Sequence, residues 1–176
     1  MKERGWKLRQ DNLLEADISS FTDLTPLEQE NLSTVMIELK GWATHNIDQI
    51  LSVMAEDLVF YDITMTHQLT GHQEMRKFAH NMLDPIADFT PCVESFVVKG
   101  DTVVNMGHYS GIVEKEFFGM PATGKRFDCP YCQVAVLQEG KIKYMRDHWN
   151  LVDMYQQMGW DCGLLNTGGY LNSPEK

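Results

Sequence analysis

The second half of the chain constrains the fold most strongly, because it alternates long apolar runs with tight turns. Strands are predicted where β-branched and aromatic residues gather, at residues 93–98, 102–113, 126–137 and 142–152. Lys99-Gly100-Asp101 and Glu139-Gly140-Lys141 join two pairs of these runs with the short glycine turns of β-hairpins. The pattern therefore predicts a long antiparallel meander.

The first half begins with the signals of a helix. Thr25 can cap a helix whose first position is Pro26, and Glu28 completes a capping box. Apolar residues then recur on one helical face from Leu27 to Ala43. We therefore expect the first helix to span this stretch and to pack with one side on a core.

A short helix, a strand and a third helix are predicted to follow, over residues 47–54, 58–63 and 71–83. Asp84-Pro85 ends the third helix, because proline cannot continue it. Helices followed by consecutive strands indicate an α+β fold. We expect one domain over residues 24–160, an N-terminal arm at 1–23 and a flexible tail at 161–176.

Charge and hydropathy exclude several classes of function. The formal net charge is −10 without basic clusters, which argues against nucleic acid and anionic membranes as partners. No apolar run approaches the ~18–20 residues of a membrane span. The first residues lack the apolar core of a signal peptide, so we expect a cytoplasmic protein.

The cysteines give a weak motif. Cys129 and Cys132 have the spacing of a redox or half-zinc site, but no second such pair exists, so ordinary buried thiols are the favoured interpretation. A zinc site can be drawn from His108, Asp147 and His148. Strand alternation puts Asp147 and His148 on opposite faces, so no metal site is predicted.

Four stretches resemble the SnoaL-like polyketide cyclases of the NTF2-like superfamily. They are residues 55–62 with Gly71, residues 100–104, the loop Phe117-Phe118-Gly119-Met120-Pro121-Ala122-Thr123-Gly124-Lys125, and residues 140–142 running on to 146–150 and 156–159. The resemblance implies an NTF2-like cone, in which three N-terminal helices pack in a strongly bent mixed or antiparallel sheet around a pocket. It also implies cofactor-independent chemistry and pairing of two copies through their sheets.

Two carboxylates are the leading candidates for that chemistry. Asp62 ends the predicted strand at 58–63, where the resemblance to ketosteroid isomerase places a base. Alternation sets Asp147 on one face with Met145 and Trp149, the face that the resemblance turns towards the pocket. Burial raises the pKa of a carboxyl group, which suits it to acid/base work near neutral pH. The alternative roles are a hydrogen bond to the next loop for Asp62 and a salt bridge for Asp147.

Other candidates depend on which side of a strand faces the pocket. Counting from the Gly100 turn favours Tyr109 and Asn105 inward, but a small gap would bring in His108 instead, so both His108 and Tyr109 are kept. His67 follows Asp62 in a loop that could cover the pocket. The predicted substrate-binding residues are Trp42, Phe78, His80, Met82, Asn105, Tyr131, Met145 and Trp149.

These features lead to a hypothesis and an alternative. The hypothesis is a lyase, cyclase or isomerase without cofactor, acting by aldol-type or elimination chemistry on a small aromatic or polyketide-like molecule. The alternative is a non-catalytic ligand-binding or dimerisation module, since the same fold serves both. Apolar residues on the outer sheet face, Val104, Met106 and Val136, favour a homodimer.

Overall fold

A computed structural model describes residues 12–161. Six strands form one sheet in the order β2-β1-β6-β5-β4-β3. They are β1 Met54–Asp62, β2 Leu69–Thr70, β3 Ile86–Lys99, β4 Thr102–Val113, β5 Arg126–Gln138 and β6 Lys141–Trp149. Strand β1 pairs with β6 in parallel and the other pairs are antiparallel, so the sheet is mixed. The α+β class expected from the sequence is confirmed.

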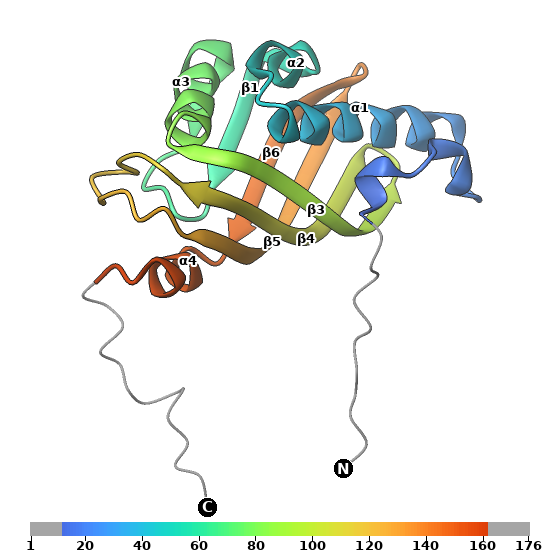
Figure 1. Ribbon diagram of the computed structural model, residues 1–176. Helices are drawn as coiled ribbons and strands as arrows, with labels where there is room; N and C mark the ends of the chain where they lie inside the picture. The colour runs from blue at the N-terminus through green and yellow to red at the C-terminus, as the bar shows by residue number, and fades with distance from the viewer. Residues whose placement is uncertain (1–11, 162–176) are drawn as a thin grey trace, which may run out of the picture.

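The helices are α1 Pro26–Ala43, α2 Ile47–Ser52, α3 Gly71–Leu83 and α4 Leu151–Met158, with 3-10 turns at Leu13–Glu15 and Ile18–Ser20. Helices α1, α2 and α3 lie together on one face of the curved sheet (Figure 1). Helix α4 lies apart from these three, at the lower left of the same view, and packs against β5. No helix in residues 12–161 is long and apolar enough to cross a membrane.

The core fills the space between α1–α3 and the concave face of the sheet. Alternate residues of β4 and β5 are buried, as period-two patterning requires. Burying such large side chains contributes about 1.5–3 kcal/mol each relative to exposure. The largest fully buried side chains include Leu32, Leu39, Ile50, Phe60, Phe127 and Ile142.

The start of α1 is held as its sequence predicts. The Thr25 hydroxyl accepts from the Glu28 backbone N–H at 3.3 Å, and the Glu28 carboxylate accepts from the Thr25 N–H at 2.9 Å. The same carboxylate also accepts from the Gly100 N–H in the β3–β4 turn, at 2.9 Å. These bonds, chiefly the one from Gly100, lower the pKa of Glu28 to about 2.

Replacing Glu28 by Gln is expected to lower the melting temperature at pH 7 by a few degrees. A carboxyl whose folded pKa lies below its unfolded value stabilises the protein above pH 4.5, and this is lost as the pH falls through about 2. The difference between wild type and variant should therefore shrink on acidification. Thermal unfolding from pH 2 to 7 measures it, with Glu30→Gln as the exposed control; equal losses in both variants would contradict it.

The structure corrects three element boundaries. Met54 opens β1 instead of ending α2, because it pairs with Ile142 of β6. Strand β3 begins at Ile86, well before the predicted residue 93. Residues 150–152 do not continue β6: the Asn150 side chain caps α4 by accepting from the Asp153 N–H.

Residues 12–23 pack on the same chain. The Asn12 side chain donates to the Pro91 carbonyl at 3.2 Å and accepts from the Val93 N–H at 2.8 Å, both in β3. Leu14 is buried, and the Phe21 ring meets that of Phe96 edge-on. The rest of the predicted arm and most of the predicted tail lie outside the described residues.

Candidate functional site

Four polar residues form one continuous row across the concave face of the sheet. Asn105 of β4 is directly opposite Gln133 of β5, and Gln133 is directly opposite Asp147 of β6. Asp147 is in turn directly opposite Asp62 of β1. All four side chains are buried, at 9% exposure or less. A polar row inside an apolar core costs free energy unless its groups are paired or used, so it marks a candidate site.

Asp147 lies in the middle of the row. The Tyr109 hydroxyl donates to Asp147 Oδ2 at 2.9 Å, whereas Asp147 Oδ1 has no hydrogen-bond partner. Burial raises the pKa of Asp147 well above its ordinary value, and the nearby charge of Asp62 raises it further. Asp147 is therefore held as a neutral acid at pH values where ordinary carboxyls are ionised.

Asp62 has a different environment, at the end of β1. Its Oδ1 accepts from the Thr64 N–H at 2.8 Å and from the Thr64 hydroxyl at 2.6 Å. Its Oδ2 accepts from the Trp149 ring N–H at 2.9 Å. Asp62 thus accepts three hydrogen bonds where Asp147 accepts one from a side chain, so neighbouring acids in the row have contrasting surroundings.

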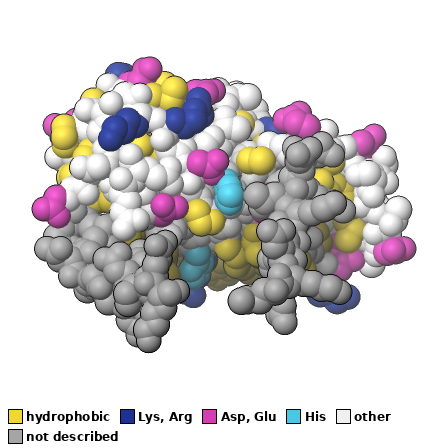
Figure 2. All heavy atoms as spheres, turned by 60° about the horizontal axis from the view of Figure 1, so that its bottom comes forward, with side chains coloured by type: hydrophobic (Ala, Val, Ile, Leu, Met, Phe, Trp, Pro, Cys, Tyr) yellow, Lys and Arg dark blue, Asp and Glu magenta, His cyan; other side chains and the backbone are white. Residues whose placement is uncertain are grey.

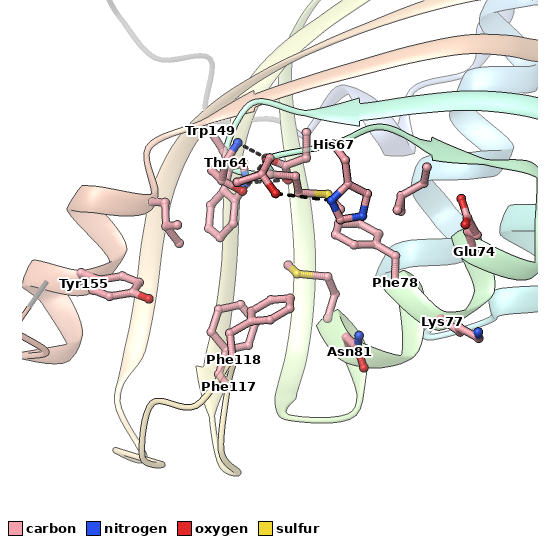
Figure 3. A pocket seen from close by; sticks show the side chains of 16 residues that line it. Thr64, His67, Glu74, Lys77, Phe78, Asn81, Phe117, Phe118, Trp149 and Tyr155 are labelled. Atoms are coloured by element: carbon pink, nitrogen blue, oxygen red, sulfur yellow. Dashed lines mark hydrogen bonds between the residues drawn. The ribbon is translucent and has the colours of Figure 1, made fainter.

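Asp62 also lines two neighbouring cavities. The outer one has a volume of about 590 Å³ and lies between α3, the β4–β5 loop that carries Phe117, and helix α4, which carries Tyr155 (Figure 3). The inner one has a volume of about 20 Å³, room for a single small group, and is lined by both Asp62 and Asp147. The walls shared by the two cavities are Asp62, Phe78, Met82 and Trp149.

The structure places Tyr109, and not His108, on the pocket side of β4. The regular pairing of β4 with β5 leaves no gap that would invert the register. The His108 ring lies on the outer face, where its Nδ1 is 3.0 Å from Asp128 Oδ1. His108 as a pocket residue is therefore wrong.

Of the two other histidines predicted at the site, one lines a cavity and the other does not. His67 lines the outer cavity, and its Nδ1 lies 3.4 Å from the Thr66 hydroxyl (Figure 3). His80 is exposed on α3 and its Nδ1 is 3.4 Å from Asp84 Oδ1. His80 lies two positions beyond Phe78, about 200° around a helix, so it turns away from the cavities and its predicted role there is wrong.

Most of the predicted substrate-binding residues line at least one of the two cavities. Two predicted residues lie behind them: Asn105 donates to Gln133 Oε1 at 2.8 Å, and the Tyr131 ring stacks on Tyr109 with centroids 3.8 Å apart. Neither lines the inner or the outer cavity. The predicted residues that do line them are Trp42, Phe78, Met82, Met145 and Trp149.

Sequence reasoning missed part of the outer wall. Phe117 and Phe118, from a motif that the sequence had singled out without a role, line the outer cavity. Leu151 and Tyr155 come from α4, which the sequence analysis had not predicted. The apolar spacing of Leu151, Met154 and Tyr155 behind a capping Asn was the available signal.

A further missed residue is Glu38, which lies in the apolar face of α1 and is fully buried. The Trp42 ring N–H donates to Glu38 Oε1 at 2.6 Å, while Oε2 makes no hydrogen bond of normal geometry. Burial raises the pKa of Glu38 to about 7. A single acid within the stripe of Val35, Leu39 and Trp42 was the signal in the sequence.

Cys129 and Cys132 do not form a paired site. Cys129 and Cys132 are three residues apart on β5, so one thiol points to the core and the other to the outer face. Within residues 12–161 no three His, Cys, Asp or Glu side chains come close enough together to hold a metal ion.

Comparisons with known proteins add to this geometry. The family model described as SnoaL-like polyketide cyclase matches residues 34–158. A comparison with curated protein sequences found no match.

Solved structures share the fold. A candidate SnoaL-like polyketide cyclase from Jannaschia sp. CCS1 has 22% identity and a TM-score of 0.72 over 78% of this chain and 97% of its own. A Catenulispora acidiphila protein with a ketosteroid isomerase-like fold has 17% identity and a TM-score of 0.66, over 78% and 96%. An LEH-like epoxide hydrolase from M. tuberculosis has 17% identity and a TM-score of 0.62, over 76% of this chain and 92% of its own. The predicted NTF2-like fold is thereby confirmed.

Proposed function

Because this chain belongs to the SnoaL-like polyketide cyclase family, we propose that it is a cofactor-independent acid/base enzyme acting on a small aromatic or polyketide-like molecule. The observation that carries the proposal is the pairing of two neighbouring buried carboxyls with opposite surroundings, Asp62 among three donors and Asp147 desolvated. Environments that separate two acids in this way suit one for taking a proton and the other for giving one.

The roles follow from the contacts. Asp62, which lines the outer cavity, is the base that removes a proton from a carbon next to a carbonyl group of the substrate. Asp147, neutral and with an unpartnered oxygen, is the acid that donates to the carbonyl oxygen as negative charge develops there. Tyr109 holds Asp147 in place through its hydroxyl.

This pair of steps produces an enol from the substrate carbonyl. Carbon–carbon bond formation or cleavage of the aldol type, dehydration and isomerisation all pass through such a species. Aldol-type chemistry is favoured over hydrolysis, because neither acid of the row is paired with an arginine within the described residues. The cavity shape favours a ring-bearing substrate, since aromatic side chains form much of the outer wall.

The alternative, a binding or dimerisation module, predicts that basic side chains inside the protein neutralise the acids and that no open cavity exists. In residues 12–161 Asp62 and Asp147 bond only to neutral donors, and both face cavities. One buried side-chain oxygen without a partner, Asp147 Oδ1, lies at the inner cavity, whereas the others in that range, on Glu38, Asn105 and Tyr131, belong to residues that line neither cavity. An unmet polar group at a cavity favours a site that receives a polar ligand.

Deuterium exchange tests the proposal without knowledge of the final product. Aromatic 1,3-dicarbonyl and phenolic polyketide-like compounds are incubated with the protein in D2O, and exchange at the carbon next to the carbonyl is followed by NMR. We expect the wild type to catalyse exchange of at least one class and Asp62→Asn to abolish it. Exchange no faster than in buffer for the whole panel, with no compound bound beside Asp62 in soaked crystals, would favour the binding module.

We also propose that the chain forms a homodimer through the outer face of the sheet. Val97, Met106 and Tyr144 are 54%, 38% and 51% exposed there, beside the half-buried Val104 and Val136. Figure 2 brings the underside of the sheet forward and shows hydrophobic side chains in its lower centre. Exposed apolar patches of this kind mark interfaces.

Size-exclusion chromatography with light scattering should give twice the mass of one chain for the wild type. Met106→Glu should give a monomer, because it places a charge in the apolar face. The exposed substitution Glu30→Gln on α1 is the control and should leave the dimer intact. A monomeric wild type at micromolar concentration would contradict the proposal.

A further inference from the structure

Glu38 is the one fully buried acid that the proposed chemistry leaves without a role among the described residues. Its side chain has no solvent exposure, and α1 carries it onto the concave face of the sheet above the polar row. A buried carboxyl costs several kcal/mol when charged and unpaired, so its presence in a core calls for a function.

Glu38 has two polar neighbours at the site, Trp42 and Gln133. Through Oε1 it accepts from the ring N–H of Trp42, which forms a wall of the inner cavity. The Gln133 side chain also lies near enough to stabilise its ionised form. Glu38 therefore bonds to one residue that borders the space into which Asp147 faces, and a second such residue lies near it.

Gln133 is oriented for this connection. Its Oε1 accepts from Asn105 Nδ2 at 2.8 Å, which leaves the Gln133 amide N–H groups free to donate. Gln133 has Glu38 above it on α1 and Asp147 beside it on β6 as its acidic neighbours. One amide is thus set between two carboxyls from different elements.

We propose that Glu38 is a positioning residue for the acid Asp147: it fixes Trp42 at the inner cavity and is electrostatically coupled to Asp147, with Gln133 between the two carboxyls. This inference rests on the proposed function for its consequence, because it assigns Glu38 to the site of that same reaction. Glu38 acts through other residues and does not touch the outer cavity.

The charged and titratable groups around Asp147 are Asp62 on β1, Glu38 on α1, Tyr109 on β4, and Tyr131 and Cys132 on β5. Burial raises the pKa values of both tyrosines and of the Cys132 thiol above their ordinary values, so they stay neutral near pH 7. Asp62 and Glu38 are therefore the groups whose charge can act on Asp147 in this range.

Carboxyl ¹³C NMR of protein labelled in Asp and Glu measures the coupling directly. In the wild type, Glu38 should titrate near pH 7, and the Asp147 resonance should show an inflection at the same pH. Glu38→Gln should remove this inflection and lower the Asp147 midpoint by roughly half a pH unit or more, because a negative charge has been removed. The alkaline limb of the turnover profile should move to lower pH by the same amount.

Trp42→Phe separates coupling from packing. It deletes the donor to Glu38 Oε1 but keeps the Glu38 carboxyl, so the shared inflection should remain. An Asp147 midpoint that is unchanged in Glu38→Gln, or shifted equally in Trp42→Phe, would overturn the proposal. Should Glu38→Gln fail to fold, a wild-type Asp147 curve without an inflection near pH 7 overturns it.

These outcomes are distinct from failure of the proposed function. An enzyme mechanism without Asp147 would leave Asp147→Asn active while the NMR coupling to Glu38 persisted. If instead Asp147 is the acid but is not coupled to Glu38, Asp147→Asn would be inactive and the Asp147 resonance would show no inflection near pH 7.

Discussion

Replacing Asp147 by Asn is expected to lower turnover at least about 100-fold while the protein stays folded. Asn has nearly the same shape and can still accept from the Tyr109 hydroxyl, so the contact at 2.9 Å survives. It cannot release a proton to a substrate oxygen, which is the role proposed for Asp147. Turnover or deuterium exchange on the most active compound of the panel measures the loss.

The matched control is Asp101→Asn, which changes an exposed acid in the β3–β4 turn. It should keep full activity. Tyr109→Phe should give a smaller loss, because it removes the hydroxyl that positions Asp147 but leaves the acid. Full activity of Asp147→Asn with well-folded protein would remove Asp147 from the mechanism.

The Asp147→Asn variant should also change how the stability of the protein depends on pH. A carboxyl whose folded pKa is raised stabilises the protein below its unfolded pKa near 3.8, and this is lost as the pH rises through the folded value. Asn does not ionise, so Asp147→Asn should be at least as stable as wild type at pH 8. The advantage should grow between pH 5 and 8 in thermal unfolding.

Replacing Gly107 by Ala is expected to give the largest loss of stability, about 3 kcal/mol or more. Gly107 faces inward on β4, opposite an irregularity in β3 between Val93 and Ser95. A Cβ built there would lie 1.9 Å from the Cys92 carbonyl oxygen, a backbone atom that cannot rotate away. Since β3·β4 is the most extensive strand pair, the clash must displace one of the two strands.

Thermal unfolding should show a fall in melting temperature of roughly 6 °C or more for this domain size. Gly119→Ala is the contrasting variant, because it has φ 82° but no atom within 4 Å of the added Cβ. It should cost only the ~1–2 kcal/mol of a left-handed backbone. Equal effects of the two substitutions would show that the clash at Gly107 is relieved at little cost.

The sequence was sufficient for the α+β class and most of its elements because the main signals are local, whereas the NTF2-like arrangement was expected from the family resemblance. The capping box at Thr25 and Glu28, the stop at Asp84-Pro85 and the glycine turn at Gly100 each depend on a few neighbouring residues. Strand alternation likewise set Asp147 on the face of Met145 and Trp149 before any contact was known. Missed boundaries, such as the start of β3, lie where pairing with a distant strand extends an element that its own residues define weakly.

The site depended on the tertiary structure. Alternation alone could not choose between His108 and Tyr109, because a shift of one residue inverts a strand; the unbroken β4–β5 register made the choice. Nothing near Glu38 in sequence indicates Gln133 or Asp147, which approach it only when α1 packs on the sheet. The sequence thus determined most of the elements and the inward face of β6, since these follow from local sterics and periodicity. Packing decided which acids become neighbours and how their proton affinities differ, because burial and charge depend on residues far apart in the chain.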